Sequence, residues 1–220
     1  MLLQRFIDIG RLPAALFALL GLVACASGGP AKPADSEPES LTGEGVDGQQ
    51  VTVVIPPQVQ TLYEQAAAAM AAGDYVDAEL RFKEFSLQYA EYPGAYVNLA
   101  IIHARNGNNE AAKSAVDAAL ALNPDYPAAL NQLGMLLRRN GNFLEAEAAY
   151  MKAVTVNPDY ALAHYNLGVL NELYLQRLDV ALQHFESYQA LVGEDKQVEK
   201  WIADLRRRIA ATQRTANVAE

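Results

Sequence analysis

The tetrapeptide Asn-Pro-Asp-Tyr occurs twice in this chain, at residues 123–126 and 157–160, and the two copies lie 34 residues apart. A period of 34 residues is the length of a helix–turn–helix unit, and one such unit cannot bury its apolar face alone. The sequence therefore predicts an α-solenoid of stacked helix pairs. When the chain is shifted against itself by this interval, the following residues coincide: Tyr92, Tyr126 and Tyr160; Ala95, Ala129 and Ala163; Leu99, Leu133 and Leu167; Ala100, Gly134 and Gly168.

Glycine and proline mark the helix ends within each unit. Glycine suits the left-handed position that follows a helix, and an Asp or Asn after it can cap the next helix. Pro124 and Pro158 stop the second helix of their units. The turns between the paired helices are predicted at Gly73-Asp74, Gly107-Asn108 and Gly141-Asn142.

The repeated residues resemble the tetratricopeptide repeat (TPR) family over residues 58–193. The match is most complete in the third unit, and the fourth unit needs one extra residue near Leu175–Leu178 and lacks the turn glycine. The resemblance implies an all-α, right-handed TPR superhelix of about four repeats, at 58–92, 93–126, 127–160 and 161–193. The third-unit residues that carry the match are Leu130, Leu133, Gly134, Leu137, Ala146, Tyr150, Ala153 and Pro158.

Residues 194–220 are predicted to form a capping helix and tail. A stack of repeats needs a terminal element that covers its last apolar face. An apolar stripe at helical spacing, with charged residues on the other side, supplies such an element. We expect Trp201 to anchor this cap on the last repeat. The stripe consists of Val198, Trp201, Ile202, Leu205 and Ile209.

The first 25 residues resemble a bacterial lipoprotein signal. Arg5 and Arg11 precede an apolar run of secretory length, and the run closes with Leu22-Val23-Ala24-Cys25. The resemblance implies removal of residues 1–24, diacylglycerol on the Cys25 sulfur and a fatty acid such as palmitate on the new amino terminus. Several acyl chains anchor a protein stably. Alanine at position 26 resembles the pattern of lipoproteins sent to the outer membrane, on its periplasmic face. The alternative is an ordinary signal peptide in which Cys25 is incidental.

Residues 25–57 are expected to form the lipidated start and a flexible linker, because residues 26–50 are rich in Gly, Pro, Ser, Glu and Asp. Val51–Ile55 interrupts this composition with five β-favouring residues, and nothing else in the chain offers it a strand partner. This segment is expected either to lie on the first helices as an apolar lid or to extend a partner's sheet. The sequence does not choose between them.

Charge and motif content disfavour several classes of function. The net charge is −9 and the pI about 4.9, so no basic face is available for nucleic acid. The three histidines, His103, His164 and His184, lack metal-ligand spacing, and no nucleophile or phosphate-loop motif occurs. We therefore expect no catalysis, no metal, no cofactor and no small-molecule substrate.

The TPR resemblance implies a concave groove lined by the first helix of each repeat. Two rows of this face are predicted to be an apolar floor, which includes Ile101 and Met135, and an arginine rim. The groove would accept an extended or amphipathic peptide that carries an acidic group. The alternative is that Val51–Ile55 or a second protomer covers it. The predicted groove residues are Tyr63, Val97, Asn98, Ile101, Arg105, Asn131, Met135, Arg138, Arg139, Tyr165, Asn166 and Val169.

These features together predict a lipid-anchored adaptor without catalysis of its own, which binds and positions other envelope proteins. In layout the chain resembles the small TPR lipoproteins that act as pilots for pilus secretins or as scaffolds for cell-wall hydrolases. A secretin or type IV pilus pilot is therefore one alternative. An accessory subunit of an envelope enzyme or energy-transducing complex is another.

Overall fold

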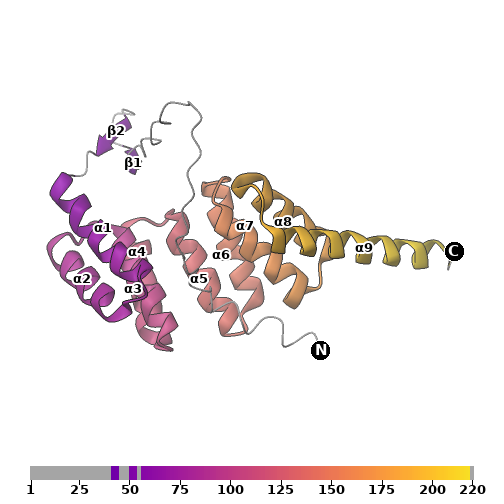
Figure 1. The fold of residues 1–220 in the computed structure, drawn as a ribbon, viewed down its shortest axis with the longest axis horizontal. Coiled ribbons are helices and arrows are strands. Elements are labelled where there is room, and N and C mark those ends of the chain that lie inside the picture. The colour runs from indigo at the N-terminus through magenta and orange to yellow at the C-terminus, as the bar shows by residue number, and fades with distance from the viewer. Residues whose placement is uncertain (1–40, 45–49, 54–55, 219–220) are drawn as a thin grey trace, which may run out of the picture.

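The computed structural model describes residues 41–44, 50–53 and 56–218, so Cys25 and the predicted signal segment lie outside the described residues. Four helix pairs follow one another along a curved stack, and a last helix continues beyond it (Figure 1). This arrangement confirms the predicted all-α solenoid. The pairs are α1 (Pro57–Ala71) with α2 (Tyr75–Gln88), α3 (Pro93–Arg105) with α4 (Asn109–Leu122), α5 (Pro127–Arg139) with α6 (Phe143–Val156), and α7 (Ala161–Leu170) with α8 (Leu178–Val192); α9 (Lys196–Val218) follows.

A two-stranded hairpin precedes the first helix. Strand β1 (Leu41–Glu44) pairs antiparallel with β2 (Gln50–Val53), with Leu41 opposite Val53 and Glu44 opposite Gln50. The prediction that Val51–Ile55 has no strand partner within the chain is therefore wrong. Antiparallel pairing uses backbone groups, so a short Leu-Thr-Gly-Glu segment can pair without an alternating apolar pattern. Ile55 and its neighbour Val54 lie outside the described residues, and the lid stays a prediction.

The turns inside the first three repeats have the predicted chemistry. Gly73, Gly107 and Gly141 have φ angles of +82°, +77° and +84°, in the left-handed region that favours glycine. The side chain of Asp74 accepts a hydrogen bond from the Asp77 amide at 3.0 Å, and Asn108 accepts one from the Ala111 amide at 3.1 Å. Asn142 makes no such capping bond, so the predicted cap is absent in the third repeat.

The two helices of a repeat approach closely where one of them carries a small residue. A Cβ atom added at Gly134 would lie 2.5 Å from the Tyr150 ring, and one added at Gly168 would lie 2.7 Å from the Phe185 ring. Both aromatic side chains are fully buried. The ring thus fills the space that the missing side chain leaves.

The fourth repeat accommodates its extra residue by a change of helix type. After α7 the chain continues as the π-helical segment η3 (Asn171–Leu175), which widens the turn by one residue. Gln176 then adopts φ +56°, the left-handed conformation that glycine supplies in the other turns. The buried Asn171 stabilises the transition, because its side-chain amide donates to the Leu167 carbonyl at 3.0 Å.

Helix α9 covers the last repeat with the predicted stripe. Val198, Ile202 and Leu205 are buried, and the Trp201 ring centroid lies 5.5 Å from that of Phe185 and 5.9 Å from that of Tyr165. The indole therefore caps the apolar face of the fourth repeat. The end of α9 projects from the stack as a single helix (Figure 1).

The Gly134–Tyr150 contact can be tested with one substitution that should destabilise the wild type but stabilise a variant without the ring. We expect Gly134→Ala to lower the free energy of unfolding by about 1 kcal/mol, because overpacking costs about 1–3 kcal/mol and the gain in helix propensity offsets only about 1 kcal/mol of that cost. In a Tyr150→Val background, the same change should stabilise. The double variant reproduces the pairing of Ala100 with Val116 that the second repeat has. Urea unfolding of the four proteins measures this, and a change of the same sign in both backgrounds would contradict the packing argument.

Candidate protein-binding face

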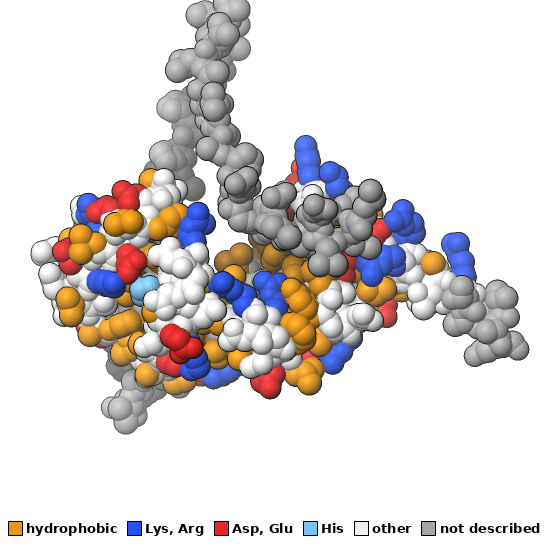
Figure 2. Space-filling model, turned by 90° about the horizontal axis from the view of Figure 1, so that it is seen from below, with side chains coloured by type: hydrophobic (Ala, Val, Ile, Leu, Met, Phe, Trp, Pro, Cys, Tyr) orange, Lys and Arg blue, Asp and Glu red, His pale blue; other side chains and the backbone are white. Residues whose placement is uncertain are grey.

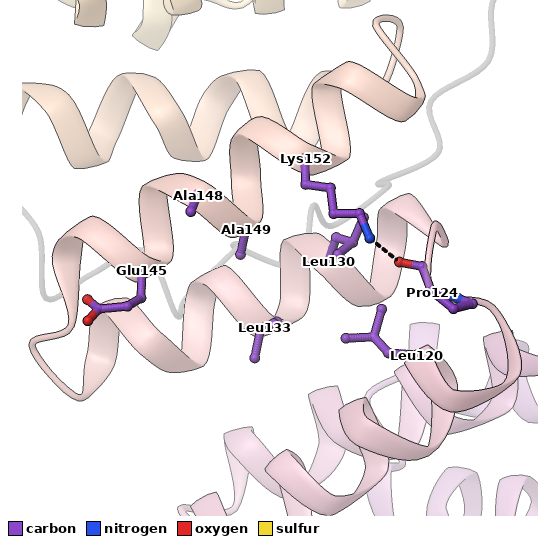
Figure 3. Close-up of a pocket in the computed structure, with 8 residues that line it drawn as sticks. All are labelled: Leu120, Pro124, Leu130, Leu133, Glu145, Ala148, Ala149 and Lys152. Carbon is purple, nitrogen blue, oxygen red and sulfur yellow. Dashed lines mark hydrogen bonds between the residues drawn. The ribbon is translucent and has the colours of Figure 1, made fainter.

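The stack is curved because the first helices of successive repeats touch while the second helices stand apart. Helix α3 contacts α5, and α5 contacts α7. On the opposite side an open furrow separates α4 from α6, and α5 forms its floor (Figure 3). The first helices therefore line the inner face of the curve, as the TPR resemblance implied.

Hydrogen bonds between first helices join each repeat to the next. The side-chain amide of Asn98 donates to the Tyr63 hydroxyl at 2.7 Å, and that of Asn166 donates to the Asn131 side-chain oxygen at 2.9 Å. Arg139 donates to the Ala104 carbonyl at 2.9 Å. Each bond joins residues 35 positions apart, and the Asn98–Tyr63 and Asn166–Asn131 bonds join equivalent positions of two different repeat pairs. These polar groups fix the spacing of the repeats.

Four of the predicted groove residues therefore belong to the interior. Val97, Asn131, Asn166 and Val169 are each no more than 6% exposed. Val97 packs between the second and third repeats, Val169 packs between the fourth repeat and α9, and the two asparagines bond to each other. In this conformation they position the inner wall and present almost no surface to a ligand.

Two further predicted residues are held by aromatic contacts. The Tyr63 ring packs edge-on against Phe82 and Phe85, with centroids 5.5 Å away in both cases. Tyr165 lies among rings of the last repeat and the cap, and burial raises the pKa of its hydroxyl. Both side chains remain partly exposed, and so does Asn98.

The structure places the other five groove residues where a ligand can reach them. Ile101 and Met135 are half-buried on α3 and α5. The Arg105 guanidinium lies over the Tyr75 ring, 4.1 Å from its centroid, and that of Arg138 lies 6.0 Å from the Tyr174 centroid. Stacking on a ring leaves the in-plane N–H donors of a guanidinium available for a carboxylate.

Arg139 completes this arginine rim and is exposed. In the view of Figure 2, basic side chains stand beside hydrophobic side chains in the middle of the molecule. Among the described residues, none of the salt bridges involves Arg105, Arg138 or Arg139. By contrast, other arginines do have carboxylate partners: Arg81 with Asp77, Arg177 with Glu147, Arg206 with Glu186 and Arg208 with Glu172.

The furrow on the outer face was not foreseen from the sequence. It has a volume of about 510 Å³, and Lys152 closes one end by donating to the Pro124 carbonyl at 2.8 Å and pairing with Asp125 at 2.8 Å (Figure 3). The residues that line it are Leu120, Pro124, Leu130, Leu133, Glu145, Ala148, Ala149 and Lys152.

Two histidines occupy the equivalent place one repeat later. His164 and His184 correspond to Leu130 and Ala149, and their Nδ1 atoms lie 3.1 Å apart. His164 Nε2 is 2.9 Å from the Pro158 carbonyl, which can only accept, so this nitrogen carries the proton. The bare His164 Nδ1 then accepts from His184. No group of three or more metal-binding side chains occurs in the part of the chain that the structure describes.

The comparisons with known proteins agree with this architecture. The tetratricopeptide repeat family matches residues 63–127, 97–155 and 131–196, which together span well over half of the chain. The chain therefore belongs to the TPR family. A search of curated proteins found no match.

Solved structures with the same fold include PilF of Pseudomonas aeruginosa, with a TM-score of 0.62 and 19% identity over 70% of this chain and 69% of that one. A thermophilic TPR protein of Thermus thermophilus has a TM-score of 0.59 and 24% identity over 68% and 82%. The first TPR of Spaghetti (RPAP3), bound to the HSP90 peptide SRMEEVD, has a TM-score of 0.50 and 18% identity over 54% and 95%. Identities this low speak to the fold alone.

None of the helices within the described residues combines the length and the apolar character needed to cross a bilayer. Helix α9, although it has 23 residues, carries charged residues along one side.

The histidine pair predicts a loss of stability in acid. Burial, and secondarily the neighbouring His164, lower the pKa of His184 from 6.5 to about 4. The unfolded chain therefore binds a proton at a higher pH than the folded chain does, and stability falls as the pH drops from about 6.5 to about 4. We expect His184 to contribute about 2 kcal/mol of this loss after allowance for solvent screening.

Urea unfolding between about pH 7 and about pH 4 measures this contribution. His184→Ala, which introduces the residue of the third repeat at this place, should flatten the pH dependence. His103→Ala is the matched control and should leave most of the pH dependence of stability unchanged. An equally steep dependence in the His184 variant would contradict the assignment.

Proposed function

We propose that this protein is a lipid-anchored TPR adaptor that binds and positions other envelope proteins through its inner face, with no catalysis of its own. The partner segment is an extended or amphipathic peptide with an acidic group. Its apolar side chains lie on Ile101 and Met135, and its carboxylate pairs with the rim formed by Arg105, Arg138 and Arg139.

One observation carries this proposal: three arginines border an apolar strip on the inner face and have no carboxylate partner among the described residues, although the chain has a net charge of −9. A charge-assisted hydrogen bond between arginine and a carboxylate contributes about 1.5–3 kcal/mol. Cationic positions kept unpaired in an acidic chain favour an acidic ligand over a neutral one.

One solved structure of similar fold, the first TPR of Spaghetti (RPAP3), binds the acidic peptide SRMEEVD, which supports an acidic peptide as the class of ligand. A chaperone-type carboxylate clamp needs lysines at particular groove positions, which this chain lacks. We therefore favour a partner that presents its acidic side chain within a longer segment.

The anchor part of the proposal rests on the Leu22-Val23-Ala24-Cys25 sequence. Lipid on Cys25 would hold the chain at the periplasmic face of the outer membrane, and residues 26–56 would separate it from the repeats. An acidic chain gains little from anionic headgroups, so the acyl chains would supply the attachment. The pilot and accessory-subunit alternatives stay predictions.

Reversal of charge in the rim tests the groove. Arg105→Glu with Arg138→Glu should reduce recovery of the acidic partner more than tenfold in affinity purification from mild detergent, because each lost contact contributes more than about 1.4 kcal/mol. The control is Lys113→Glu with Arg207→Glu, which changes the net charge equally on exposed sites away from the inner face. Equal recovery by both variants would show that the rim does not bind the partner.

The apolar strip is tested separately by Ile101→Asp with Met135→Asp. A folded double variant, verified by circular dichroism, should recover less of the same partner than the wild type does. Unchanged recovery from this folded variant would refute the apolar floor.

Replacement of the proposed lipid site tests the anchor. We expect Cys25→Ala to leave residues 1–24 uncleaved and the protein without incorporated fatty acid, because the sulfur that accepts lipid is absent. Metabolic labelling with palmitate and mass spectrometry of the amino terminus measure both. A Cys25→Ala protein that is still lipidated and mature would overturn the assignment.

A further inference from the structure

Helix α2 carries an exposed apolar row on the side that faces away from the core. Val76, Leu80 and Leu87 are 83%, 56% and 84% exposed. At 3.6 residues per turn they fall within about 40° of one another around the helix. Ala78, Phe82 and Phe85, which pack into the core, lie on the opposite side. In Figure 2, hydrophobic side chains reach the surface at the end of the molecule that holds α2.

The repeats themselves show that the fold does not require apolar residues here. All the equivalent residues on the other second helices are exposed, and most are polar or small. Only α2, among the described helices, has large apolar side chains at all three places. The equivalents are Glu110, Ser114 and Ala121 on α4; Leu144, Ala148 and Thr155 on α6; and, one residue further along, Asp179, Gln183 and Ala190 on α8.

One charged edge of the row is self-complementary under a two-fold axis. Lys83 and Glu79 form an ion pair at 2.6 Å along one edge of the row. If two α2 helices lie antiparallel with Val76 opposite Leu87 of the second copy, Lys83 comes beside Glu79 of that copy, and the reverse contact forms as well. A parallel two-fold arrangement would carry this edge of the two helices to opposite flanks of the contact, so Lys83 would not meet Glu79 of the second copy.

We propose that the α2 row is a self-association surface on which two copies of this chain pair antiparallel about a two-fold axis. The contact is isologous, so it closes at two copies. Three side chains per copy bury less than the roughly 800 Å² per partner of a standard interface, so the pair is weak and reversible. This surface lies on the outer side of the stack and leaves the inner face of both copies open.

Disulfide cross-linking tests the orientation. Val76→Cys and Leu87→Cys are introduced separately into the full chain with Cys25→Ser, purified in a non-ionic detergent, mixed and mildly oxidised. A tag on one variant separates the three products by mass. We expect the mixed disulfide to form several-fold faster than either homodimer. Faster homodimers, or rates no higher than those of a Leu144→Cys control at the equivalent position on α6, would overturn the proposal.

Sedimentation equilibrium tests the association itself. In the same background, the mass should rise with concentration toward twice that of the monomer and no further. The combined variant Val76→Glu, Leu80→Ser and Leu87→Ala gives α2 the residues that α4 carries at the same exposed places, so the fold is retained. It should stay monomeric, with unchanged helicity and melting temperature, while Leu144→Glu should associate as before. A wild type that stays monomeric, or a combined variant that still dimerises, would refute the surface.

Discussion

In the third and fourth repeats, an aromatic ring of the second helix packs against a position of the first helix that carries no side chain. Tyr150 against Gly134 and Phe185 against Gly168 set the distance between the two helices of a repeat. Because the ring belongs to the second helix and the gap to the first, neither helix can pack without the other. The burial of these rings then creates the apolar surface on which the next repeat stacks.

The difference between the two sides of the stack determines what each side can do. On the inner side, side-chain amides of neighbouring first helices bond directly, so this wall is continuous and its arginines are held at repeated intervals. On the outer side, adjacent second helices are separated and side-chain size decides whether a furrow stays open. Leu130 and Ala149 leave it open, whereas His164 and His184 fill the same place one repeat later.

The sequence predicted what periodicity and local chemistry control. The helix pairs, the left-handed turn glycines and the capping stripe of α9 could all be read from spacing and residue type. The extra residue of the fourth repeat was also located, although its form as a π-helical segment required the structure.

Features that depend on three-dimensional neighbours were missed or misplaced. Val97 and Val169 occupy predicted groove positions, but the third repeat covers Val97, and α8 and α9 cover Val169. The pairing of His164 with His184 joins two helices of one repeat, and a separation of 20 residues gives no sign of it. Strand β1 was not predicted, because its residues lack an alternating apolar pattern and its pairing with β2 depends on backbone groups.

The indole of Trp201 has a consequence for the number of repeats. Helix α9 packs on α8 as each earlier first helix packs on the second helix before it, but it brings a large ring into contact with Phe185 and Tyr165. A fifth unit would have to displace this ring in order to dock. The indole therefore occupies the surface of the fourth repeat on which a further helix pair would otherwise stack.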